Sequence, residues 1–160
     1  MPWLMAVARA GENTFHTLIR RAMPSDIVKR MIAQCAGDGV PSTEGAQAII
    51  GALKSLHAEL TMVMGMQAAS SLIAHAVHRT RPTAGWGLAP SSLVTDQTLD
   101  ALRADLAARP PAGCRAAGEF LLTTLVDHLI SLIGQPLTRR MLHAAWNLPD
   151  AELTSQESLQ

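Results

Sequence analysis

The stretch LTMVMGMQAASSLIAHAV, residues 60–77, contains no formally charged side chain. A helix of this kind either crosses a bilayer or forms the centre of a helical bundle. A membrane-spanning helix needs about 20 predominantly apolar residues, whereas this stretch includes two serines, a threonine, a glutamine, a histidine and a glycine. We therefore expect it to lie inside a helical bundle, and we expect no membrane association.

Gly65 divides this stretch into two predicted helices. Apolar residues before the glycine recur at intervals of three and four, which is typical of a helix with one buried face: Ile49, Ala52, Leu53, Leu56, Leu60 and Val63. A second apolar stripe begins after the glycine, at Ala69. The pattern predicts one helix from about Thr43 to Met64 and another from Gln67 to Arg79.

The second half of the chain repeats this arrangement at an offset of 69 residues. The segment LVDHLISLIGQPLTRRMLHAAW (125–146) aligns with LHAELTMVMGMQAASSLIAHAV (56–77), so that Gly134 falls on Gly65. Pro136 follows Gly134, where the first turn of a new helix accepts proline and a continuous helix does not. We interpret the match as an internal duplication with pseudo-twofold symmetry. Chance similarity between helices rich in alanine and leucine is the alternative.

The remaining elements complete a domain over residues 1–147. We expect a helix within 24–37 capped by Ser25, a helix over 95–109 capped by Thr95 or Asp96, and helices over Cys114–Ile133 and Pro136–Trp146. The two halves are then 25–79 and 94–147, joined by a linker over 80–93 rich in proline, glycine and serine. Residues 148–160 are expected to form a flexible tail. The predicted fold is an all-α, single-domain bundle of six to eight helices.

Composition restricts the functional classes. Apolar residues make up 48% of the chain, charged residues 16%, and the formal net charge is zero. A neutral chain lacks the general electrostatic attraction that draws basic proteins to nucleic acid, so we expect no nucleic-acid partner. Cys35 and Cys114 are not spaced for metal or redox chemistry. Together with an N-terminus that lacks a signal-peptide pattern, they favour the cytoplasm.

Histidines and carboxylates supply few candidates for chemistry. His57, Glu59 and His128 are the groups we would assign to catalysis if the protein were an enzyme, because the offset of 69 places Glu59 at the position of His128. His75 and His78 lie one helical turn apart and are weak candidates for metal binding, since no third ligand accompanies them. We predict no cofactor, and we favour a non-enzymatic protein over an enzyme.

Methionines near the two glycines suggest an interaction surface. Methionine is adaptable and is frequent on surfaces that bind other proteins. The residues assigned to an interface or a ligand site are Met62, Met64, Gly65, Met66, Ile133, Gly134, Met141 and Trp146. We therefore expect a regulatory or adaptor module that acts through homodimerisation and a protein partner. The alternative is a small-molecule or cofactor sensor with an apolar pocket between the two halves.

Overall fold

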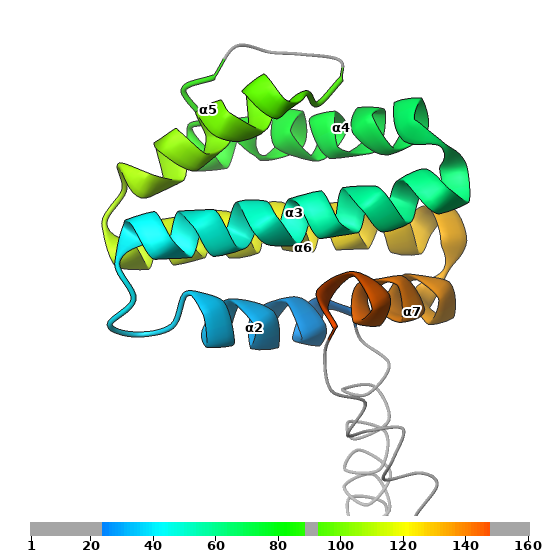
Figure 1. Ribbon diagram of the computed structural model, residues 1–160, viewed down its shortest axis with the longest axis horizontal. Helices are drawn as coiled ribbons and strands as arrows, with labels where there is room; N and C mark the ends of the chain where they lie inside the picture. Colours follow the sequence, from blue (N-terminus) through cyan, green and yellow to red (C-terminus); the bar gives the residue numbers. More distant parts are fainter. Residues whose placement is uncertain (1–23, 89–92, 148–160) are drawn as a thin grey trace, which may run out of the picture.

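The computed structural model describes residues 24–88 and 93–147. This part of the chain forms six α-helices and contains no strand, which confirms the predicted all-α bundle (Figure 1). The predictions for the remaining residues, including the tail over 148–160, fall outside this described part.

Two sets of three helices follow one another along the chain. The helices of the first half are α2 (Pro24–Cys35), α3 (Ser42–Met64) and α4 (Met66–Ala84). Those of the second half are α5 (Asp96–Ala107), α6 (Pro111–Ile133) and α7 (Gln135–Trp146).

The six helices form three layers. The long helices α3 and α6 lie side by side in the middle layer and run in the same direction (Figure 1). The helices α4 and α5 cover one side of this pair, and α2 and α7 cover the other. Each long helix contacts both outer helices of the opposite half: α3 packs against α5 and α7, and α6 against α2 and α4. The core between α3 and α6 therefore joins the two halves of the chain.

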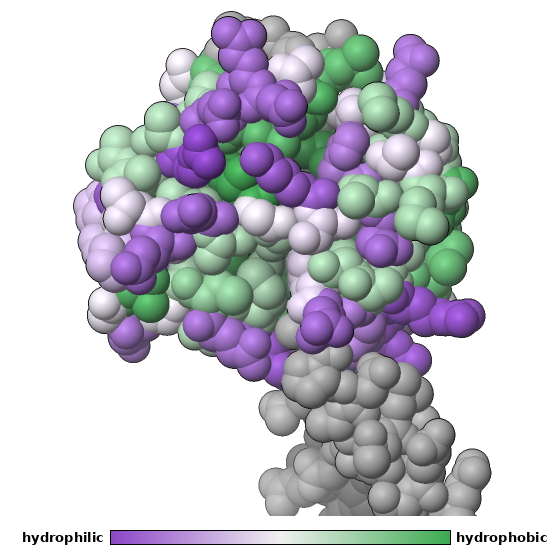
Figure 2. Space-filling view, in the orientation of Figure 1, coloured by the Kyte–Doolittle hydropathy of each residue, from purple (hydrophilic) through white to green (hydrophobic). Residues whose placement is uncertain are grey.

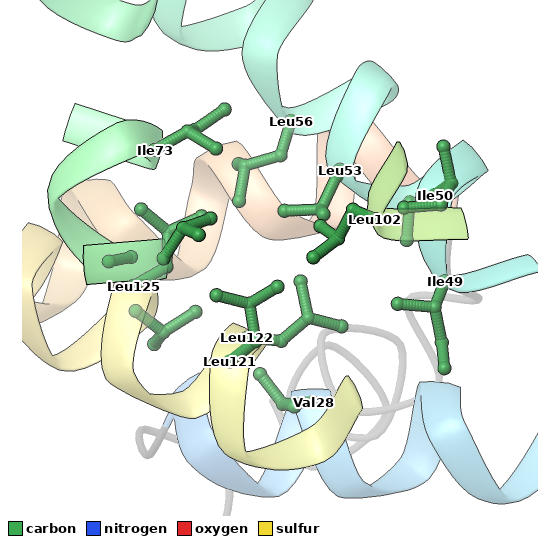
Figure 3. Close-up of a cluster of buried hydrophobic side chains, with 14 of the residues drawn as sticks. Val28, Ile49, Ile50, Leu53, Leu56, Ile73, Leu102, Leu121, Leu122 and Leu125 are labelled. Carbon is green, nitrogen blue, oxygen red and sulfur yellow. The ribbon is translucent and has the colours of Figure 1, made fainter. Parts of the chain in front are cut away.

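Leucine and isoleucine dominate this core. Leu53, Leu56, Leu121, Leu122 and Leu125 are fully buried and point toward one another from the two long helices (Figure 3). Full burial of one such side chain stabilises the folded state by about 1.5–3 kcal/mol. The apolar face that the spacing of α3 predicted is buried from Ile49 to Leu60, whereas Val63, which was assigned to the same face, is 53% exposed.

Gly118 permits a close approach of the two long helices. A methyl group built at Gly118 would overlap the side chain of Ile49, whose Cγ1 lies 3.0 Å from that position. Ile49 itself is completely buried. The isoleucine on α3 therefore fills the space that the missing side chain on α6 leaves.

A single glycine makes each of the two sharp corners, as the sequence predicted. Gly65 has φ 90° and ψ 159°, and Gly134 has φ 85° and ψ 163°. This region of backbone space is essentially restricted to glycine. The backbone N–H of each glycine still bonds the carbonyl four residues earlier, and its carbonyl accepts the bond that opens the next helix. One residue therefore ends one helix and begins the next.

Three helix boundaries differ from the predictions. Helix α2 (Pro24–Cys35) already includes Ser25 as a helical residue rather than as its cap, and α6 begins at Pro111 rather than at Cys114. Proline accounts for the earlier start of α6, because its fixed φ suits the first helical position. Helix α4 continues past Arg79 to Ala84 and so takes up the start of the predicted linker.

The predicted helix cap at Thr95 corresponds closely to the structure. Thr95 caps α5 as predicted, and its hydroxyl accepts a bond from the backbone N–H of Thr98 in a capping box.

Among the described helices, Pro111–Ile133 alone has the length and hydropathy of a membrane span. These are criteria that the core helix of a soluble protein also satisfies, and this helix is one of the two central helices of the bundle.

Candidate functional site

A groove between α4 and α6 brings together several polar side chains. His75 and Arg79 lie one turn apart on α4, while Thr124 and His128 lie one turn apart on α6. The cavity has a volume of about 380 Å³ and is lined by His75, Ala76, Arg79, Phe120, Thr124, Asp127, His128 and Ser131. It lies between helices of the two halves and most of its lining residues are polar, whereas the sensor hypothesis expected an apolar pocket.

His75 and His128 contact each other across this groove. Their ring centroids are 4.8 Å apart and their planes are inclined by 47°. Burial, together with the nearby His75 and Arg79, lowers the pKa of His128 from its usual value of 6.5. Each of these causes disfavours the protonated imidazole. His128 therefore binds a proton less readily than a free imidazole does.

The three candidate catalytic residues are dispersed. His57 bonds across the first corner, with its Nε2 2.8 Å from Oγ of the buried Ser70 on α4. His128 lies in the groove. Glu59 does not line the groove and takes no part in the hydrogen bond between His57 and Ser70. The described residues therefore do not combine this trio into one site, and His57 holds α3 against α4.

The two candidate metal ligands also separate. His75 lines the groove and faces His128, whereas His78 is exposed and does not line it. Over residues 24–88 and 93–147, no group of three or more His, Cys, Asp or Glu side chains is arranged to hold a metal ion. The partner of His75 is thus on another helix, which spacing along one helix does not reveal.

The predicted interface residues divide into exposed and buried groups. Met62 and Met66 are 83% and 69% exposed at the first corner. Met64 and Ile133 are half-buried against the core, and Met141 is buried within it. Trp146 donates from its Nε1 to the carbonyl of Ala52 at 3.0 Å and so ties α7 to α3.

Both glycine corners lie at the same end of the bundle, where α3 and α6 end (Figure 1). Large apolar side chains remain exposed there: Met62, Val63, Met66, Leu132 and Leu137. We call these five residues the apical surface. Figure 2 shows hydrophobic surface along the edge of the molecule where Figure 1 draws the corners. Exposed apolar groups that gather in one place mark contact sites more often than isolated ones do.

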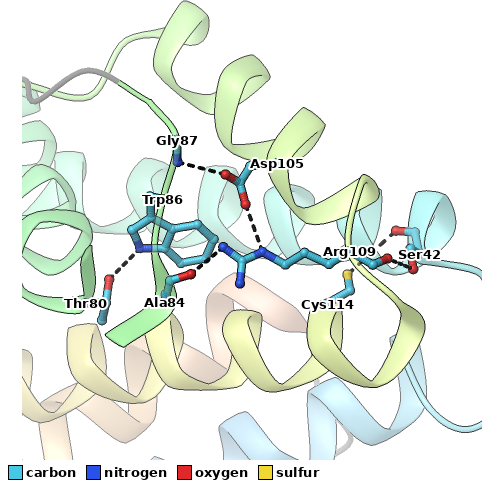
Figure 4. A network of polar contacts seen from close by, with 8 residues as sticks. All are labelled: Ser42, Thr80, Ala84, Trp86, Gly87, Asp105, Arg109 and Cys114. Atoms are coloured by element: carbon cyan, nitrogen blue, oxygen red, sulfur yellow. Dashed lines mark hydrogen bonds and ion pairs between the residues drawn. The ribbon is translucent and has the colours of Figure 1, made fainter. Parts of the chain in front are cut away.

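The opposite end is closed by a polar network around Trp86 (Figure 4). The indole Nε1 of Trp86 donates to Thr80 Oγ1 at 2.8 Å, and the Arg109 guanidinium lies 4.8 Å above its ring. Arg109 Nε donates to Asp105 at 2.8 Å, and the other oxygen of that carboxylate accepts the backbone N–H of Gly87. The described part of the predicted linker, up to residue 88, is therefore anchored by a tryptophan that is only 4% exposed.

Sequence reasoning missed the residues that make this network and most of those in the groove. Arg79 and Phe120 belong to amphipathic helices and carry no motif of their own. A partial signal was available for Trp86, because tryptophan in a segment of prolines and glycines is a large apolar side chain that needs burial. The groove had no comparable signal, since it depends on how α4 and α6 face each other.

Comparisons with protein-family models, with curated proteins and with solved structures gave no match to this chain. The functional interpretation therefore depends on its residues and their geometry.

Proposed function

We propose that this protein is a non-enzymatic regulatory or adaptor module that acts by homodimerisation through its apical surface. The exposure of this surface is the observation that carries the proposal. Most large hydrophobic side chains of the described residues lie in one core, yet Met62, Met66 and Leu132 are 83%, 69% and 58% exposed. Covering these groups removes apolar area from water, which is the dominant favourable term in most protein association.

The lack of charge in the two segments that form this surface favours a second copy of the chain over an oppositely charged partner. No Asp, Glu, Lys or Arg occurs from Leu60 to Val77 or from His128 to Thr138. An interface with a charged partner would gain its specificity from complementary charges. An uncharged apolar surface is compatible with its own copy, as a twofold dimer requires.

We also propose that the two halves arose by internal duplication. Helices α3 and α6 both have 23 residues and begin 69 positions apart, and each ends at a glycine with nearly the same φ and ψ. Exchange of α2 with α5, α3 with α6 and α4 with α7 would leave the three layers unchanged (Figure 1). Ile49 and Gly118 are themselves 69 positions apart and touch each other, as residues on a pseudo-twofold axis would.

Substitution of exposed apical residues tests the dimer without disturbing the core. We expect Met62→Asp and Leu132→Asp to shift the sedimentation of the full chain from dimer to monomer, because each would bury a carboxylate in an apolar interface. Met64 and Ile133 are unsuitable, since both pack partly against the core.

Phe120→Asp is the matched control. Phe120 lies on the same helix as Leu132, is also exposed and apolar, and lies outside the apical surface. This variant should remain dimeric. Monomeric behaviour of all three variants would point to general destabilisation, and dimeric behaviour of all three would exclude the apical surface as the interface.

A further inference from the structure

We propose that the groove between α4 and α6 binds a small organic oxyanion, whose phosphate or carboxylate group contacts His75, Arg79 and His128 while its organic part lies against Phe120. The inference does not rest on the proposed dimer, because the groove and the apical surface share no residue. Failure of one proposal would leave the other intact.

The first support is the set of side chains that the two helices bring together. The charged and titratable groups that line the groove are His75 and Arg79 on α4, and Asp127 and His128 on α6. Thr124 and Ser131 add hydroxyl groups along the α6 wall. Guanidinium, imidazole and hydroxyl donors together are a donor set suited to phosphate or carboxylate oxygens.

The second support is an arginine of the groove that no described carboxylate neutralises by a direct ion pair. Arg79 forms no ion pair within the described residues, although three other arginines pair with carboxylates there. Asp127, the carboxylate that lines the groove, is exposed and forms no ion pair with Arg79. The Arg79 guanidinium is therefore available to bind an oxyanion that enters the groove.

The third support is the size and mixed character of the cavity. About 380 Å³ lies within the range of sites that bind small molecules. Phe120, one of the two phenylalanines in the chain, is 40% exposed. Its ring gives the groove an apolar wall beside the cationic groups, which suits an anion with a flat organic part better than an inorganic ion alone.

Phenyl phosphate and inorganic phosphate are the probes that test the site. The imidazole Cε1–H signals of His75 and His128 would be followed by NMR in the full chain while each probe is added at constant pH and ionic strength. We expect saturable shifts of both signals, at least tenfold tighter binding of phenyl phosphate, and an increase in the pKa of His128 when the site is filled. An anion stabilises the protonated ring, which gives the increase its sign.

Two variants at neighbouring positions of α4 provide the comparison. Arg79→Gln removes the strongest cation of the groove and should weaken binding of phenyl phosphate by at least tenfold. His78→Gln removes an exposed histidine that does not line the groove and should leave binding unchanged.

Three results would overturn the proposal. They are shifts that stay linear with probe concentration, equal affinity in the Arg79→Gln variant, or equal affinity for the two phosphates. The last result would mean that the groove holds an adventitious ion only. Because Arg79 is exposed, its substitution should leave the fold intact, and the unchanged backbone amide spectrum would confirm this.

Discussion

The two ends of the α3–α6 pair differ in whether their large apolar side chains are buried or exposed. At the end where both helices begin, Trp86 is buried beneath Arg109 and its indole nitrogen is bonded to Thr80. At the end where both helices finish, Met62 and Leu132 extend into solvent. The chain covers one end with its own connecting segment, while no described segment covers the other. Substitutions at the closed end, around Trp86, should therefore change the free energy of unfolding. Substitutions at the open end, which carries the apical surface, should change the assembly of the chain into dimers.

Trp86→Ala should have the largest effect on stability. Removal of a buried tryptophan side chain costs about 3–5 kcal/mol, and the same change removes the surface on which Arg109 lies. Trp86→Phe keeps an aromatic ring and loses the bond to Thr80, so it should cost about 1 kcal/mol. Urea unfolding followed by circular dichroism measures both values. An alanine variant as stable as the wild type would mean that the closed end does not support the fold.

Gly118→Ala should have an intermediate effect, because the added methyl group meets the buried Ile49 side chain. Overpacking of this kind costs about 1–3 kcal/mol. Ile49→Val removes the Cδ1 methyl that would be overlapped, so the double variant should be more stable than the sum of the two single effects predicts.

Gly51→Ala is the matched control for this cycle. Gly51 is also a glycine within a long helix, but no atom lies within 4 Å of the position of an added Cβ. Alanine there should stabilise the protein by about 0.5–1 kcal/mol. Strict additivity in the Ile49–Gly118 cycle would contradict the proposed contact.

A smaller effect concerns pH and the groove between α4 and α6. The pKa of His128 is lowered in the folded protein, so the unfolded chain binds its proton first as the pH falls below 6.5. As far as it depends on His128, the free energy of unfolding should therefore be constant above this pH. It should decrease as the pH falls from 6.5 to the pKa of His128 in the folded protein. In urea unfolding at pH 7.5 and 5.5, His128→Gln should reduce this decrease, and His78→Gln should not. Equal pH dependence in the wild type and His128→Gln would contradict the assignment.

The two cysteines should differ in reactivity with almost no effect on stability. Cys35 is exposed, whereas Cys114 is buried near Ser42 at the closed end, and burial raises the pKa of its thiol despite the nearby Arg109. A thiol reagent such as Ellman's reagent should modify one cysteine in the native protein and the second only in denaturant. In the Cys35→Ser variant the fast phase should disappear. Fast modification of that variant would mean that the closed end opens readily.

Periodicity and glycine placement predicted most of the fold. Leu53, Leu56 and Leu60 were expected to share a buried face, and all three are buried. The helix breaks at Gly65 and Gly134 were predicted correctly, because proline and glycine act locally on the backbone. The end of α4 was predicted too early, since tertiary contacts of Ala84 and Trp86 extend the ordered chain beyond Arg79.

The groove was much less predictable than the fold. His128 was singled out for its position in the repeat, yet its actual neighbour is His75, from a helix more than fifty residues earlier. Spacing along one helix indicated His78 instead, because residues three apart share a face whatever lies opposite. Contacts between helices depend on packing angles and on close approaches such as that at Gly118, which the sequence does not encode as a local pattern.

Sedimentation equilibrium of the full wild-type chain over a wide concentration range tests the assembly role of the open end most directly. The proposed dimer predicts a mass that approaches twice the 17.0 kDa of one chain as the concentration rises. It also predicts that Met62→Asp stays at the mass of one chain while its urea unfolding changes by less than about 0.5 kcal/mol, as is usual for exposed positions. A wild-type protein that keeps the mass of one chain at every concentration would contradict the proposal.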